Sequence, residues 1–105
     1  MRTLKFLVDK QRLKKDPDCD FSMIVAGSVN YLKLKFQFSP EWQGCKKAVS
    51  FWKDDVEHAT ILDKNDECYV HEAVANEKVY KISVTGLRPD GYTITSSKWA
   101  ITQEV

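Results

Sequence analysis

Strict alternation of apolar and polar residues over positions 31–38 constrains the fold of this chain more than any other feature of the sequence. Successive side chains of a β-strand point to opposite sides, so a run with this period is typical of a strand with one buried face. Its apolar side consists of Leu32, Leu34, Phe36 and Phe38. Pro40 ends the run, because proline cannot donate a hydrogen bond to a neighbouring strand, and a second apolar run covers residues 48–51. The segment therefore predicts two strands that meet at a corner.

The rest of the chain repeats this succession of strand patterns and turn signals. We expect further strands at residues 3–8, 47–53, 56–62, 67–70, 78–86, 92–95 and 98–102. Proline and aspartates make residues 14–20 a loop. Residues 71–76 fit a single helical turn, and residues 22–26 are either a strand or a buried connector.

About seven or eight short strands separated by turn signals are typical of a sandwich or a barrel. No segment offers a long crossover helix, so we expect antiparallel pairing. The chain has 105 residues, which fits a single domain. The sequence therefore predicts an all-β, immunoglobulin-like antiparallel β-sandwich that spans residues 1–105.

The overall composition argues against several classes of function. Apolar residues make up 43% of the chain and charged residues 30%, as in an ordinary soluble domain. The formal net charge is only +1, whereas nucleic-acid binders carry a clear basic excess. No apolar run approaches the ~18 residues of a membrane span, and the charged N-terminal segment lacks the apolar region of a signal peptide. We expect synthesis and folding in the cytoplasm, with no nucleic-acid partner and no membrane span.

The residues that could carry chemistry are few and scattered. The three cysteines include no Cys-x-x-Cys pair, so a zinc site is not expected; whether Cys45 and Cys68 pair is left open. Cys68 and His71 lie three residues apart, but we interpret Cys68 as part of a strand rather than of a catalytic dyad. The aspartates of residues 16–20 lack the glycine and distal glutamate of a calcium loop. The sequence predicts a non-enzymatic protein without cofactor or metal.

Large aromatic residues are the remaining candidates for function. We interpret Trp42, at the strand corner, as a core residue that closes one end of the sandwich. The predicted structural core consists of Phe36, Phe38, Trp42, Ala48, Phe51 and Val84. Alternation places Trp52 on the face opposite Val49, so we expect Trp52 to be exposed. The predicted contact surface consists of Trp52, Tyr80 and Tyr92.

Two parts of the chain resemble sequence patterns of small β-sandwich proteins from Firmicutes phages and prophages. They are the segment FSPEWQGCKKAVSF and the later strand VYKISVTG. These are structural modules of tails and baseplates, similar to the N-terminal part of baseplate upper proteins. The residues that match the first pattern are Phe36, Phe38, Ser39, Glu41, Trp42, Gly44, Lys47, Ala48 and Phe51. The later strand is matched by Val79, Ile82, Val84 and Gly86. The family's matching positions are structural, so the resemblance implies no catalytic residue.

The resemblance implies a phage-derived structural protein that is made in the bacterial cytoplasm, is associated with the virion and acts by protein–protein contact. Its expected partners are phage structural proteins or further copies of itself, with edge strands as docking surfaces. Two alternatives remain open. One is a carbohydrate-binding module that stacks a host cell-surface glycan on its exposed aromatic residues. The other is a small phage protein that inhibits a host defence factor by surface contact.

Overall fold

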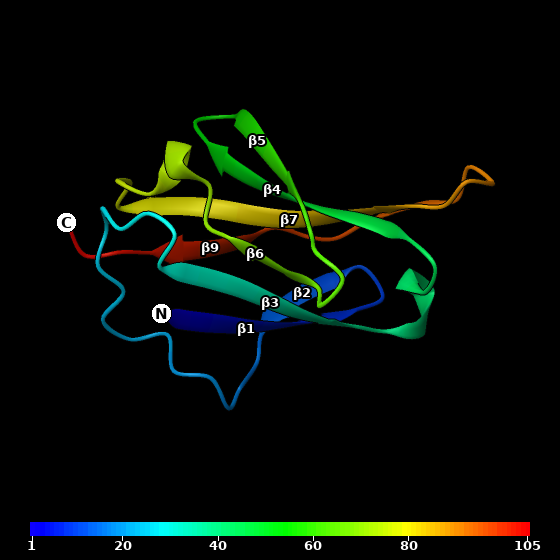
Figure 1. Cartoon of the computed structure of the whole chain (residues 1–105), viewed down its shortest axis with the longest axis horizontal. Coiled ribbons are helices and arrows are strands. Elements are labelled where there is room, and N and C mark those ends of the chain that lie inside the picture. The colour runs from blue at the N-terminus through cyan, green and yellow to red at the C-terminus, as the bar shows by residue number, and fades with distance from the viewer.

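Nine β-strands form two sheets that pack face to face in the computed structural model, which describes residues 1–105 (Figure 1). The four-stranded sheet has the order β2-β1-β3-β6 and the five-stranded sheet the order β5-β4-β7-β8, with β9 also paired to β7. The strands are β1 (Arg2–Asp9), β2 (Arg12–Lys15), β3 (Leu32–Phe38), β4 (Lys46–Lys53), β5 (Val56–Ile61), β6 (Glu67–Tyr69), β7 (Val79–Leu87), β8 (Thr93–Thr95) and β9 (Trp99–Thr102). The all-β sandwich predicted from the sequence is confirmed.

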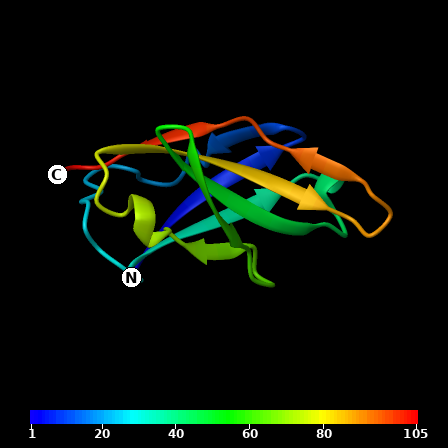
Figure 2. The same cartoon turned by 90° about the horizontal axis from the view of Figure 1, so that it is seen from above.

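Two single turns of 3₁₀ helix interrupt the strands. The first, η1 (Pro40–Trp42), forms the corner between β3 and β4, and the second, η2 (Glu72–Val74), follows β6. The second turn lies within residues 71–76, where the sequence predicts a helical turn. Both chain ends lie at one end of the sandwich, whereas the β7–β8 hairpin extends from the other (Figures 1 and 2).

The expectation of purely antiparallel pairing is wrong for one strand pair. Strands β1 and β3 run parallel, with Leu4 opposite Leu34 and Phe6 opposite Phe36. A parallel pair needs a long connection but not a helical one. Here residues 10–31 supply it, through β2 and an extended loop. The alternation in each strand was sufficient to predict its buried face but not its direction.

One further segment differs from the prediction, and for another the sequence left two alternatives open. Residues 12–15 form β2, which pairs antiparallel with β1, although the sequence predicts a loop from residue 14. The turn between these strands holds Lys10 at a positive φ of 56°, without the glycine or asparagine that marks such a turn in a sequence. Residues 22–26 form a connector and not a strand: of these residues only Ile24 is buried, and Val25 makes an isolated parallel bridge to Glu104.

The core lies between the two sheets and is rich in aromatic side chains. The rings of Phe6 and Phe36 stack with centroids 5.4 Å apart, and Trp42 lies 5.1 Å from Phe38. Trp42 is fully buried at the corner, as predicted, and its indole N–H donates to the carbonyl of Lys10 at 2.7 Å. The corner is therefore fixed both by packing and by a hydrogen bond that satisfies the buried indole.

Four of the six predicted core residues are buried, Phe38 packs against the core while partly exposed, and Ala48 lies outside the core. Phe38 is partly buried because it is the last residue of β3, and the ammonium of Lys47 lies 4.7 Å from its ring centroid. Ala48 is also partly exposed. It alternates with the fully buried Val49 and Phe51, so its side chain lies on the outer face of the five-stranded sheet. The core assignment of Ala48 is therefore wrong by one position in the strand.

Candidate binding surfaces

Tyr80, one of the three predicted contact residues, lies inside the protein. Its side chain is only 2% exposed, because in β7 it alternates into the core with Ile82 and Val84. Burial raises the pKa of its phenol, and the hydroxyl has no hydrogen-bond partner. The prediction that Tyr80 belongs to a contact surface is therefore wrong.

Trp52 and Tyr92 are partly exposed, but each is covered by a cation of the protein itself. The ammonium of Lys98 lies 4.0 Å from the ring of Trp52, whose indole N–H donates to Ser83 at 2.9 Å. The guanidinium of Arg88 lies 4.1 Å from the ring of Tyr92. Trp52 lies opposite Lys81, near the start of β7, whereas Tyr92 lies beyond the end of β7. The two rings therefore do not form a common surface.

The cysteine and histidine pair noted in the sequence does not form a catalytic arrangement, and His71 lies instead beside His58. The rings of His58 and His71 lie 5.0 Å apart, and the Nδ1 atom of His71 accepts a hydrogen bond from the backbone of Ala73. Burial, with a contribution from the Asp63 carboxylate, raises the pKa of the Cys68 thiol to about 12. The thiol is therefore protonated at neutral pH, and all three cysteines are free. No group of three or more potential metal ligands is present.

Strand β5 forms one free edge of the five-stranded sheet. The N–H of Leu62 donates to the carbonyl of Lys47 on β4 at 2.9 Å. Bonded and non-bonded residues alternate in an antiparallel pair, so every second residue back to Val56 also bonds to β4. The intervening residues direct their backbone groups away from the sheet, namely Glu57, Ala59 and Ile61. Six residues of strand therefore offer an unpaired edge to the surroundings.

This edge lacks the features that usually prevent strands from pairing between molecules, such as lysine, proline or a bulge. Its one charged residue, Glu57, accepts a hydrogen bond from the hydroxyl of Ser50 on the neighbouring strand, so its carboxylate lies back on the sheet. The other edges are covered or shorter. Strand β2 is capped by hydrogen bonds from Leu13 to Ser97 and from Ser97 to Gln11, and β6, β8 and β9 comprise three, three and four residues.

A second candidate surface lies at the end of the sandwich that holds both chain termini. The loop before β3 exposes four large apolar side chains, those of Met23, Val25, Val29 and Tyr31. Met23 is 76% exposed and has a positive φ of 53°, a conformation that is rare for a residue with a long side chain. We call these four residues the apolar rim. Clustered exposed apolar side chains mark binding surfaces more often than single ones do.

The guanidinium of Arg2, in β1, holds this loop in place. It donates hydrogen bonds to the backbone carbonyls of Asp20 at 3.0 Å, Ser22 at 2.6 Å and Met23 at 3.0 Å. Asp20 in turn accepts a hydrogen bond from the backbone of Ser22, and hydrogen bonding to Ser22 lowers the pKa of the Asp20 carboxyl. The unusual backbone of Met23 is therefore held by hydrogen bonds to Met23 itself and to the residues just before it.

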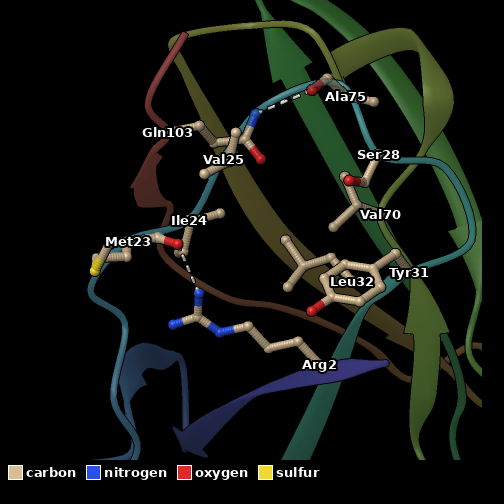
Figure 3. A pocket seen from close by; sticks show the side chains of 10 residues that line it. All are labelled: Arg2, Met23, Ile24, Val25, Ser28, Tyr31, Leu32, Val70, Ala75 and Gln103. Atoms are coloured by element: carbon tan, nitrogen blue, oxygen red, sulfur yellow. Dashed lines mark hydrogen bonds between the residues drawn. The ribbon is translucent and has the colours of Figure 1, made fainter.

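Three residues of the apolar rim, Met23, Val25 and Tyr31, line a pocket of 310 Å³ (Figure 3). Seven of its ten lining residues are hydrophobic, including Ile24, Leu32 and Val70. Polar groups are contributed by Ser28, Arg2 and the side chain of Gln103. An apolar cavity with a few polar groups is the usual form of a ligand site, although this one is at the small end of the ~300–1,000 Å³ range.

Sequence reasoning missed every residue of this pocket. They come from β1, the loop before β3, the first residue of β3, the segment after β6 and the C-terminal segment, which only the folded chain brings together (Figure 3). One signal was present: the run from Met23 to Val25 is apolar but lies between turn residues and has no strand partner of its own length.

Comparisons of the chain with protein-family models, with curated proteins and with solved structures gave no match. The structure contains no helix of the length and apolar character needed to cross a membrane.

Proposed function

We propose that the protein is a structural module that acts by protein–protein contact and associates with further copies of itself through the edge of β5. The free, unprotected edge of this strand is the observation that carries the proposal. Edge strands of this kind pair readily with a strand of another chain. The resemblance of the segment FSPEWQGCKKAVSF to phage sandwich proteins supports a place in a tail or baseplate assembly.

The sequence of β5 suits antiparallel pairing between two copies about a twofold axis at Ala59. In that register the outward-facing backbone groups of Ala59 meet those of its counterpart, and Glu57 lies opposite Ile61 of the second copy. Like charges placed directly opposite each other destabilise a strand pair, and this register avoids them. The small side chain of Ala59 leaves room for the second strand, and a symmetric dimer is the commonest form of homo-oligomer.

Sedimentation equilibrium of the wild-type protein and of Ala59→Lys tests the proposal. At micromolar concentration we expect the wild type to reach twice the monomer mass. Ala59→Lys places a charge at the twofold axis and should remain a monomer with an unchanged far-ultraviolet spectrum. Thr95→Lys, an equally exposed substitution on β8, is the matched control and should associate as the wild type does. A strictly monomeric wild type, or equal association of both variants, would contradict the proposal.

The alternative functions receive less support from the geometry. A glycan platform would need exposed aromatic faces, but Tyr80 is buried and the faces of Trp52 and Tyr92 carry the cations of Lys98 and Arg88. Inhibition of a host defence factor would also proceed by surface contact, and no feature of the surface favours it over self-association.

A further inference from the structure

The pocket beside the apolar rim contains a side-chain hydrogen-bond acceptor whose direction is fixed, the oxygen of Gln103. This residue is 4% exposed, and its amide nitrogen donates to the carbonyls of Ala75 at 3.2 Å and Glu77 at 2.8 Å. Both partners are acceptors, so only the amino group of the side chain can face them. The oxygen must then point the other way, into the pocket (Figure 3). It makes no hydrogen bond within the protein.

From this arrangement we infer that the pocket binds an aromatic side chain carrying a hydrogen-bond donor, the indole of a tryptophan or the phenol of a tyrosine, presented by a partner protein. The apolar walls favour a ring, and the volume of 310 Å³ limits the guest to a single large side chain. A guest that fills the pocket displaces solvent from the unpaired oxygen of Gln103, and an acceptor left unsatisfied in this way is unfavourable, so the guest must supply a donor. Phenylalanine fills the space but leaves that oxygen without a partner.

The apolar rim favours a protein as the source of this group over a free small molecule. Met23, Val25 and Tyr31 line the pocket and yet remain largely exposed, so the apolar surface continues from the pocket onto the outside of the protein. Binding hot spots have this form: an aromatic anchor in a pocket, ringed by contacts that exclude water. Methionine adapts its shape readily to such a partner, and the three hydrogen bonds of Arg2 hold Met23 in its exposed position.

This site is separate from the β5 edge, so the inference does not rest on self-association. Strand β5 belongs to the five-stranded sheet, whereas the pocket lies at the end of the sandwich near the N-terminus (Figures 1 and 3). The protein could therefore join copies of itself along one edge and hold a different protein at its end.

Titration of the wild-type protein with indole and with 1-methylindole tests the donor requirement. Methyl resonances of Ile24, Leu32 and Val70 report binding in the pocket. We expect indole to shift these resonances and 1-methylindole, which lacks the N–H, to bind about fivefold more weakly. Equal affinities would overturn the role of Gln103, and the absence of shifts with both compounds would overturn the site.

Two variants and one peptide complete the test. Val70→Phe fills the pocket and should abolish the shifts of Ile24 and Leu32, whereas Val79→Phe, on the exposed side of β7, should leave them unchanged. The peptide acetyl-Val-Trp-Val-amide should bind about tenfold more tightly than indole, because its flanking residues contact the apolar rim. Indole binding as tightly as the peptide would show a small-molecule site and overturn the assignment to a partner protein.

Discussion

At the scale of single residues, the corner of the sandwich depends on a close contact between Gly86 and the ring of Trp42. A Cβ atom at position 86 would lie 2.9 Å from Cε3 of Trp42 and 3.0 Å from the Cβ atom of Cys45. Neither the buried ring nor the backbone-bound Cβ can easily move away. The glycine is therefore required by the space that the tryptophan occupies and not by its backbone angles.

We expect Gly86→Ala to lower the free energy of unfolding by about 1–3 kcal/mol, as for other overpacked core positions. Without the clash, alanine in place of glycine would stabilise the protein by about 0.4–1 kcal/mol through the unfolded state. Urea denaturation of Gly86→Ala, alone and combined with Trp42→Leu, measures the coupling. Gly86→Ala should lower the free energy of unfolding by less when Trp42 is replaced by leucine. An equal loss with and without the tryptophan would contradict this account.

The buried thiol of Cys68 makes the stability of the protein depend on pH in the alkaline range. The folded state holds the thiol protonated up to a pKa of about 12, whereas the unfolded chain releases the proton near the ordinary value of 9.0. The unfolded state is therefore increasingly favoured above pH 9, and the stabilisation present below that pH is lost as the pH rises towards 12.

Between pH 8 and pH 10 we expect Cys68 to contribute a loss of about 1 kcal/mol in the free energy of unfolding. Urea denaturation at the two pH values should show a smaller loss for Cys68→Ala than for the wild type. Cys45→Ala keeps the buried thiol and should show the same loss as the wild type. The phenol of Tyr80 is retained in all three proteins, and because burial is the main cause of its raised pKa, with Cys68 the smaller one, most of its effect cancels in the comparison. An identical loss in Cys68→Ala would contradict the assignment.

The candidate sites were largely beyond sequence reasoning at this scale. Trp42 could be placed correctly because a large aromatic at a proline-marked corner has few alternatives to burial. Tyr80 could not, since Val79 and Tyr80 are both apolar and either could face the core. The oxygen of Gln103 acquires its direction from the carbonyls of Ala75 and Glu77, which no local pattern in the sequence reveals.

At the scale of secondary-structure elements, the strands whose apolar residues alternate were predicted within one or two residues. Strands β1, β3 and β4 are examples, because burial of one face of each strand in the core stabilises it. The prediction failed where contacts with distant segments of the same chain determine the structure. Strand β2 is stabilised by β1 and by residues 95–97, and the parallel direction of β3 depends on how residues 10–31 cross the sheet.

The loop before β3 is an element held by side chains rather than by a regular backbone pattern. Arg2→Lys keeps the positive charge but loses the planar fork that reaches three carbonyls. We expect the backbone amides of residues 22–27 to exchange with deuterium about tenfold faster in this variant, because local opening becomes easier. Exchange in β4 and β7 should not change. Arg12→Lys, at an exposed position of β2, is the control, and equal exchange in both variants would contradict the role of Arg2.

At the scale of the whole molecule, the even balance of charge separates two ways in which copies could associate. The chain carries 16 basic and 15 acidic residues, so no strong overall field attracts or repels a second copy. Pairing through β5 would join mainly backbone groups, with Glu57 as the one acidic side chain of the strand. An alternative contact could use the charged edge at β6, where Lys33 and Lys35 share the carboxylate of Glu67.

Because salt screens exposed charges over about 10 Å at 0.1 M and about 3 Å at 1 M, the dissociation constant distinguishes these contacts. We expect it to change less than about threefold over that range of sodium chloride if the copies pair through β5. Sedimentation equilibrium at each salt concentration measures it, and Glu67→Gln, which removes the carboxylate at β6, should leave it unchanged. A steep weakening with salt, together with a loss of association in Glu67→Gln, would move the contact from β5 to the charged edge of the other sheet.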